Sequence, residues 1–215
     1  MRITKIESQK KNPKRKNIFA DGEFVVGISD ETLLRAGLRT GDEISDERIK
    51  ALVQEEEISG AKRVALRFLA HRPRAAKEIR NKLREKEFGD EDIEQTIESL
   101  KRAGLLNDTE FARMYIRDAL SAKPTGRTLL RRKLLLLGVE KVTVEEALST
   151  AFTTVDERVE ALEAGGKFLK KSTATRRPAD LRQLRHRLST FLMRRGFGWD
   201  TVEPVIKELM KEVDE

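Results

Sequence analysis

The sequence contains no cysteine among its 215 residues. That absence excludes disulfide bonds, thiolate nucleophiles and cysteine-ligated zinc or iron–sulfur sites, and it fits a reducing cytosol. The chain has only 2 histidines, His71 and His186, and neither has a second histidine at helical ligand spacing, so we expect no metal. No hydrophobic run is long enough to cross a bilayer, and residues 1–16 lack the apolar segment of a signal peptide. We therefore expect a soluble cytoplasmic protein that does not associate with membranes.

Enzymatic motifs are scarce as well. Neither histidine accompanies a Gly-x-Ser-x-Gly elbow, and residues 123–128 lack the glycine frame and the preceding strand of a phosphate-binding loop. The sequence offers no nucleophile, base and orienting group that can be placed together. We therefore expect a protein that is not an enzyme, with no catalytic residues and no cofactor.

What the sequence has in abundance is charge, at 38% of residues, with 44 lysines and arginines against 37 acidic residues. The basic excess is concentrated in residues 121–199, which hold 17 lysines and arginines against 8 aspartates and glutamates, a net charge of +9. Eleven of those cations are arginines, which favour bidentate contacts to phosphate or carboxylate. This half is expected to attract a polyanion or an acidic protein face, although helix dipoles and ordinary solvated surface also use such residues.

The first 45 residues read as a small sheet. Short alternating runs flank Asp21-Gly22, the dipeptide that favours a type I′ hairpin turn, and Asn12-Pro13 indicates an earlier turn. We expect a three-stranded meander, with the basic cluster at residues 10–16 near its first turn acting as a solubilising loop tip or as a nucleic-acid contact.

Helical periodicity follows the expected sheet. Ser29 or Asp30 is expected to cap a helix at 31–36, and Ser45 or Asp46 a helix that runs to about Glu57. From there the pattern predicts only helices and turns.

The helical part contains an internal repeat. An offset of 51 pairs Ile79 with Leu130 and Leu83 with Leu134, and an offset of 109 continues these two series at positions 188 and 192. We interpret the recurring apolar positions as core. Each unit is expected to contain three helices, at residues 60–71, 74–87 and 91–102, then 109–121, 126–137 and 143–151, then 156–171, 179–195 and 200–212. The third unit carries extra residues around 172–177.

The predicted fold is mainly α. It consists of three tandem three-helix repeats in an elongated curved array, preceded by the β-meander. The segments are a β-rich extension at 1–45, a linker helix with repeat 1 at 46–107, repeat 2 at 108–153 and repeat 3 at 154–215.

Basic residues recur on the middle helices of the second and third repeats. Arg127 and Arg131 are four residues apart and share a face, as do Arg182 and Arg185, three residues apart. The candidate partner-binding or nucleic-acid-binding residues are Arg127, Arg131, Arg132, Lys133, Arg182, Arg185, Arg194 and Arg195.

Several motifs together resemble a known family. They are Ala65–Leu69 followed by Arg72-Pro73-Arg74, Gly104–Asp108 followed by Phe111-Ala112-Arg113, and Phe191-Leu192 followed by Arg194-Arg195-Gly196-Phe197. With these motifs the chain resembles RecX, the bacterial regulator of the RecA recombinase, over about residues 60–212. Ala75 stands where the family commonly has serine, and Glu87 where it commonly has glycine.

The resemblance implies a partner and an activity. RecX proteins bind the RecA–single-stranded DNA filament, lie along its groove, block its extension and thereby lower the ATPase, strand-exchange and coprotease activities of RecA. We therefore expect a monomeric regulator of DNA recombination, DNA repair and the SOS response that contacts single-stranded DNA within the filament. The alternative is a direct DNA-binding protein, because three-helix units with a basic helix also resemble helix-turn-helix modules.

Overall fold

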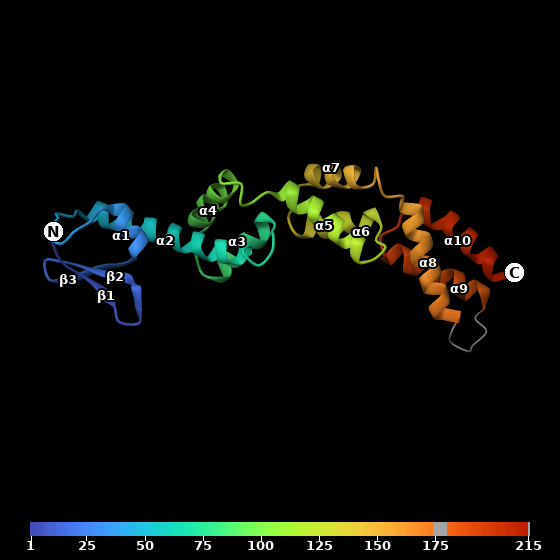
Figure 1. Ribbon diagram of the computed structural model, residues 1–215, viewed down its shortest axis with the longest axis horizontal. Helices are drawn as coiled ribbons and strands as arrows, with labels where there is room; N and C mark the ends of the chain where they lie inside the picture. The colour runs from blue at the N-terminus through green and yellow to red at the C-terminus, as the bar shows by residue number, and fades with distance from the viewer. Residues whose placement is uncertain (174–179, 215) are drawn as a thin grey trace. The chain divides into compact units, whose positions relative to one another are not determined.

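The computed structural model describes residues 1–173 and 180–214, which form three strands followed by ten helices. The strands are β1 (Ile3–Gln9), β2 (Asn12–Ala20) and β3 (Glu23–Ser29). The helices are α1 (Asp30–Ala36), α2 (Asp46–Leu69), α3 (Ala76–Glu85), α4 (Asp90–Arg102), α5 (Asp108–Ala122), α6 (Arg127–Leu136), α7 (Lys141–Ala151), α8 (Glu157–Thr173), α9 (Leu181–Arg194) and α10 (Trp199–Asp214). The expected class, mainly helical with an N-terminal β-meander, is confirmed (Figure 1).

The chain divides into two compact units. The first contains Met1–Pro73 and Ile79–Leu106, and the second contains Arg74–Glu78 and Asn107–Glu215. The first turn of α3 therefore packs with the second unit.

The sheet is antiparallel with the order β1-β2-β3. Asp21 and Gly22 have φ angles of +49° and +89°, so the type I′ turn is confirmed. The first turn is formed by Lys10 and Lys11, and the prediction that placed it at Asn12-Pro13 is wrong. Pro13 is tolerated inside β2 because β2 pairs with β3 only from Arg15 onward. At position 13, therefore, no backbone N–H is needed to donate to β3.

One long helix joins the sheet to the first repeat. Ser29 and Ser45 cap α1 and α2 through their side chains, which confirms one of the two capping candidates for each helix. The expected end of the second helix near Glu57 is wrong, because α2 continues through Gly60 to Leu69. A Cβ atom at Gly60 would lie 3.3 Å from the ring of Phe88, so this glycine permits close contact with the turn between α3 and α4 rather than ending the helix.

A buried carboxylate ties the sheet to α2. Glu56 is 6% exposed and accepts hydrogen bonds from the backbone N–H and the hydroxyl of Ser29, from Thr32, and from the guanidinium groups of Arg15 and Arg63. Burial alone would raise the pKa of Glu56, but these hydrogen bonds outweigh it and lower the pKa. The ionised carboxylate therefore fastens β3, α1 and α2 together.

The repeat predicted from the sequence is present in the helices. α6 begins and ends 51 residues after α3, and α7 begins 51 residues after α4. α10 begins 109 residues after α4, whereas α9 begins four residues earlier than that offset requires. The recurring apolar positions are buried, as predicted, at Ile79, Leu83, Ile93, Leu130, Leu134, Val144, Leu188, Leu192 and Val202. The extra segment expected around 172–177 lies mostly outside the described residues.

Each middle helix ends in the same left-handed turn. The residue at this turn is Glu87 in the first repeat, Gly138 in the second and Gly196 in the third, with φ angles of +63°, +85° and +89°. In each case the next backbone N–H donates to a carbonyl of the last helical turn, which is the hydrogen bond of a Schellman motif. The position favours glycine because L-residues are strained at positive φ.

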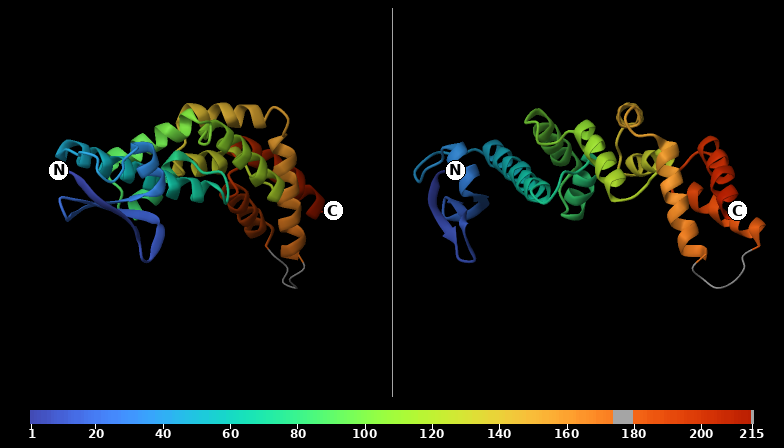
Figure 2. Two further views of the ribbon diagram at one scale, coloured as in Figure 1. Left: turned by 60° about the vertical axis from the view of Figure 1, so that its left-hand side comes forward. Right: turned by 45° about the vertical axis from the view of Figure 1, so that its right-hand side comes forward.

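The third repeat has a core of its own. Buried residues of α8, α9 and α10 form one apolar cluster that includes Ala161, Leu188, Phe197 and Val205. Both views in Figure 2 show the three helices side by side.

Candidate partner-binding surface

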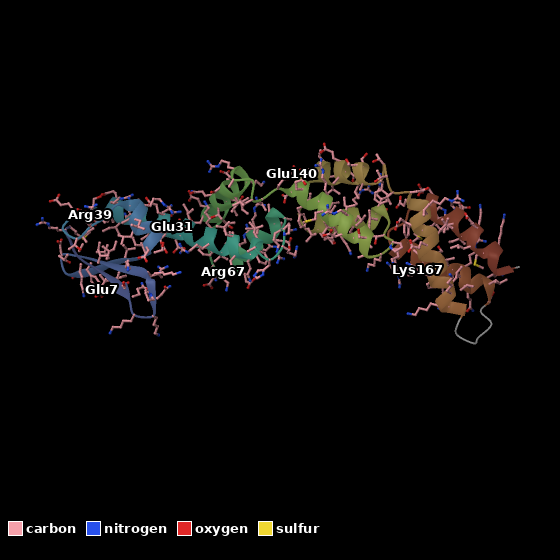
Figure 3. The ribbon with its side chains drawn as sticks, in the orientation of Figure 1. Glu7, Glu31, Arg39, Arg67, Glu140 and Lys167 are labelled. Carbon is pink, nitrogen blue, oxygen red and sulfur yellow. The ribbon has the colours of Figure 1, made fainter. Side chains whose placement is uncertain are left out.

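Charged side chains cover the outside of the helices. Arg67, Glu140 and Lys167, labelled in Figure 3, are all exposed. Because both signs are interspersed, a candidate site depends on which cations are already paired within the fold.

The structure divides the eight candidate cations into two sets. Three make contacts within the fold, and they are Arg127, Arg131 and Arg195. In the described part of the chain the other five have no ion-pair partner, and they are Arg132, Lys133, Arg182, Arg185 and Arg194.

Arg131 joins the middle helix of the second repeat to its last helix. Its Nε and Nη2 atoms donate to the two carboxylate oxygens of Glu145 at 2.6 and 2.8 Å. The hydrogen bonds from Arg131 lower the pKa of Glu145, and the same interaction raises the pKa of Arg131. Arg80 and Glu94 repeat this geometry 51 residues earlier, at the same two distances. The recurrence indicates a helix-to-helix clamp that belongs to the repeat.

Arg127 and Arg195 lie at the seam between the second and third repeats. The Arg127 backbone N–H donates to Glu157, and its guanidinium lies 5.0 Å from the centre of the Phe152 ring. The Arg195 guanidinium donates to the Pro124 carbonyl at 3.3 Å. Both arginines therefore have positions set by the packing of these repeats.

Two glycines bring the backbones together at this seam. The Gly126 N–H donates to the Arg195 carbonyl at 2.9 Å, and the Thr128 N–H donates to the Gly196 carbonyl at 3.0 Å. A Cβ atom at Gly126 would lie 2.2 Å from the Gly196 oxygen, and one at Gly196 would lie 2.3 Å from Leu129. No larger residue fits either position without a shift of the backbone.

A related seam joins the start of α3 to the second repeat. The Ala76 N–H donates to Asp108 at 2.9 Å, as the Arg127 N–H does to Glu157 at 2.8 Å. Lys77 packs its stem against Gly138, the counterpart of Gly196. Within the second unit, the starts of α3 and α6 therefore make similar contacts, each against the turn that ends the following middle helix.

The unpaired cations of α9 do not form one patch. Arg182 and Arg185 are three residues apart and lie on one side of the helix. Arg194 comes nine residues after Arg185, which places it about half a turn around the helix and about 13.5 Å along it. A single ligand group on Arg185 cannot also reach Arg194.

A pocket of about 270 Å³ lies between α9 and α10. Arg182 and Arg185 line it together with Ser189, Trp199 and Glu203. His186 and Ile206 also line the pocket, and only Arg182 and Arg185 among the lining residues were predicted to bind a partner. Trp199 was detectable as the one tryptophan in the chain, placed where the other repeats have Asp90 and Lys141.

A second pocket, of about 490 Å³, lies beside Arg127 and is lined by residues 152–157. Arg127 Nε is buried there and has no hydrogen-bond partner in the described structure. Residues 1–173 and 180–214 contain no cluster of three or more side chains able to hold a metal ion. Within the same residues no helix has the length and apolar character needed to span a membrane.

Comparison with protein families decides where the chain belongs. Three family models match it, namely the regulatory protein RecX N-terminal domain at residues 1–45, the first RecX three-helix domain at 61–100 and the second at 107–148. The chain belongs to the RecX family. The resemblance noted in the sequence is thereby confirmed, and it extends to the N-terminal sheet.

Curated relatives match almost the whole chain. The protein named Regulatory protein RecX from Clostridium acetobutylicum is 31% identical over 98% of this chain and 97% of its own length. The one from Bacillus subtilis is 32% identical over 99% of this chain and 79% of its own length. The family is thus named for regulation, which fits the expectation of a protein that is not an enzyme.

Solved structures of the family share the fold. A crystal structure of regulatory protein RecX matches with a TM-score of 0.75 at 24% identity, over 95% of this chain and 98% of that one. The structure of RecX from Lactobacillus salivarius matches with a TM-score of 0.62 at 23% identity, over 72% of this chain and 97% of that one.

Proposed function

We propose that this protein binds the RecA–single-stranded DNA filament and inhibits its extension, lowering the ATPase, strand-exchange and coprotease activities of the recombinase. The observation that carries the proposal is membership of the RecX family over nearly the full chain. We also propose that the protein acts as a monomer in the cytoplasm, within DNA repair and the SOS response.

The unpaired cations of the second and third repeats support an anionic partner. Arg132 and Arg194 are exposed and form no ion pair in the described part of the chain. Binding of such cations to a phosphate backbone is favourable because it releases counterions, and binding to a carboxylate is favourable because it forms charge-assisted hydrogen bonds. Binding through them should weaken as salt is raised.

The proposal is tested by titrating this protein into the single-stranded-DNA-dependent ATPase reaction of the cognate RecA at fixed salt. Inhibition well below one molecule per RecA protomer is expected, because one bound molecule can stop many additions to a polymer. Inhibition only near the ratio that saturates the DNA would indicate competition for the strand instead.

A charge-reversal pair locates the surface. We expect Arg132→Glu to raise the half-inhibitory concentration by roughly 5-fold, the equivalent of ~1 kcal/mol for one exposed ionic contact. Lys141→Glu is the matched control, because Lys141 is also exposed in the second repeat and begins α7, where an acidic residue suits the helix dipole. Equal inhibition by both variants would remove Arg132 from the binding surface.

Direct DNA binding is the second candidate function, and the exposed arginines Arg182, Arg185 and Arg194 on the middle helix of a three-helix unit favour it. Tight binding to duplex DNA without any effect on the ATPase would establish this second function in place of the first.

A further inference from the structure

The third repeat lacks the clamp that the first two share. The repeat position of Arg80 and Arg131 is occupied by Ser189, while the acidic position is retained as Glu203. The arginine side chain that would cross between the middle and last helices is therefore missing. The pocket of about 270 Å³ lies at this place and is lined by both Ser189 and Glu203.

The third repeat also has an additional turn on its middle helix. α9 begins at Leu181, four residues before the position that matches the first residue of α3. The additional turn carries Arg182, which lies three residues before Arg185 and seven before Ser189, on one side of the helix. Both arginines line the pocket, and neither has an ion-pair partner in the described part of the chain.

An aromatic ring completes the site from the other helix. Trp199 is the first residue of α10, is 56% exposed and takes no part in the buried core of the repeat. Glu203 and Ile206 follow it at intervals of four and seven residues, so the three share one side of α10. The ring is thus presented at the pocket without a packing role that would explain it.

The charges of the pocket favour an anion. Glu203 forms an ion pair with Lys207, with 2.9 Å between Glu203 Oε1 and Lys207 Nζ. The hydrogen bond from Lys207, together with the charge of Arg185, lowers the pKa of Glu203, so the carboxylate is ionised and already neutralised by a partner. Arg182 and Arg185 have no ion-pair partner in the described part of the chain, and two arginines with Lys207 outnumber the one carboxylate, which disfavours a cationic ligand.

We propose that this pocket binds one nucleotide of single-stranded DNA, with the base stacked on Trp199 and the adjoining phosphates on Arg182 and Arg185. Stacking on an exposed aromatic ring beside basic residues is the usual means of holding single strands without reading their sequence. The volume lies near the lower limit of ~300 Å³ for small-molecule sites, which suits a single base. An acidic peptide would use the arginines but would leave the ring without a role. The proposal rests on the proposed function for the source of the strand, which is the DNA of the filament.

Trp199 provides its own probe, because its fluorescence is the only tryptophan signal of the chain. We expect a short oligothymidylate to quench this fluorescence in a saturable way that weakens with salt. With a labelled oligothymidylate followed by anisotropy, Trp199→Ala should weaken binding by roughly 5- to 150-fold, the range for loss of one base–aromatic stack. Quenching that does not saturate would overturn the proposal.

Arginine variants test the phosphate contacts. Arg185→Gln should weaken binding, whereas Arg187→Gln should not, because Arg187 lies two residues further and faces away from the pocket, over the ring of Phe168 at 5.9 Å. Equal losses in the two variants would show a diffuse charge effect and would overturn the assignment.

Ser189→Arg separates the pocket from simple electrostatics. The new arginine should pair with Glu203, as Arg80 and Arg131 pair with Glu94 and Glu145, and should fill the pocket. Binding should then weaken although the variant is more positively charged. Unchanged or tighter binding, with an unchanged far-ultraviolet circular dichroism spectrum, would overturn the proposal.

Competitors identify the ligand class. An oligothymidylate should displace the labelled strand far better than an abasic oligodeoxynucleotide or polyglutamate of equal charge. Equal displacement by the abasic strand would exclude stacking, and equal displacement by polyglutamate would indicate an acidic peptide site. These binding assays contain no RecA, so they are independent of the ATPase test. Absence of Trp199 quenching by the oligothymidylate, with the RecA ATPase still inhibited, would refute only the pocket. Quenching of Trp199 without inhibition of the ATPase would refute only the proposed function.

Discussion

The first two repeats and the third share a buried core but differ in what joins their middle and last helices. The first two use a bidentate arginine–glutamate pair, Arg80 with Glu94 and Arg131 with Glu145. The third replaces the arginine with Ser189 and has a pocket there. Leu188 and Leu192 pack the helices of the third repeat without the clamp, and the pocket lies where the arginine would be.

The repeats also differ at the turn after the middle helix. Gly138 and Gly196 each face a residue of the preceding middle helix, whereas Glu87 occupies the same left-handed position in the first repeat. A glutamate side chain is tolerated at position 87 because this turn is not pressed against a preceding middle helix. The same backbone conformation therefore carries a packing requirement in two repeats and only a conformational preference in the other.

The largest expected effect comes from adding a side chain at the close backbone contact between the second and third repeats. Gly196→Ala should lower the free energy of unfolding by about 3–4 kcal/mol, because the added Cβ is strained at φ +89° and would lie 2.3 Å from Leu129. Gly166→Ala is the matched control, since nothing lies within 4 Å of its Cβ position and alanine favours a helix interior by about 1 kcal/mol. Urea unfolding measures both. Similar stabilities for the two variants would show that the backbone contact at Gly196 is not close.

The turn that ends the middle helix of the first repeat allows the reverse substitution, in which a glycine is introduced at the left-handed position. Glu87→Gly should raise the free energy of unfolding by about 0.5–1 kcal/mol, because relief of positive-φ strain exceeds the added entropy of the unfolded chain. The measurement is the same urea series, with Glu85→Gly as a control at the last residue of α3. This control should lose stability, because it removes both helix propensity and the ion pair with Lys82. A loss of stability in Glu87→Gly would mean that the side chain has a compensating contact.

These repeats show which features the sequence could predict. The core positions followed from spacing alone, since Leu83, Leu134 and Leu192 recur at helical intervals and must share a buried face. Helix starts were predicted correctly at Ser29 and Ser45, but the helix after Ser45 was expected to end near Glu57, whereas α2 continues to Leu69. A glycine such as Gly60, which in the structure admits the ring of Phe88, looks the same in sequence as one that ends a helix.

The candidate site was harder to predict, because a charge count does not reveal which cations are paired. Arg131 looked available on its helix, yet its partner Glu145 is contributed by the following helix. Aligning the acidic positions of the repeats as well as the apolar ones would have exposed the clamp and its absence at Ser189. Trp199 was missed because a single exposed aromatic residue is ordinary on a protein surface.

Removing a clamp should have a smaller effect than Gly196→Ala and an effect no larger than that of Glu87→Gly. Arg131→Ala should lower the free energy of unfolding by about 0.5–1 kcal/mol, a value discounted because both side chains are more than one-third exposed to solvent. The hydrogen bond from Arg131 lowers the pKa of Glu145, so the stabilisation is present above the ordinary glutamate pKa and is lost as the pH falls through the lowered one. Urea unfolding at neutral and acidic pH checks both parts. Arg132→Ala, with no partner to lose, should be near neutral, and a pH-independent difference for Arg131→Ala would mean that packing rather than the ion pair is responsible.

Installing the clamp in the third repeat should have the smallest effect on stability. Ser189→Arg places an arginine opposite Glu203, whose carboxylate is already paired with Lys207, so the new pair partly replaces an existing one. The unfolding midpoint should shift upward by less than Arg131→Ala lowers it, or stay where it is. Ser189→Lys is the control, because a lysine carries the charge but cannot form the bidentate contact. A marked loss of stability in Ser189→Arg alone would mean that the third repeat cannot accommodate the clamp. In that case the helices around the pocket would differ in spacing from those of the first two repeats, and the open site would be a consequence of packing rather than of one missing side chain.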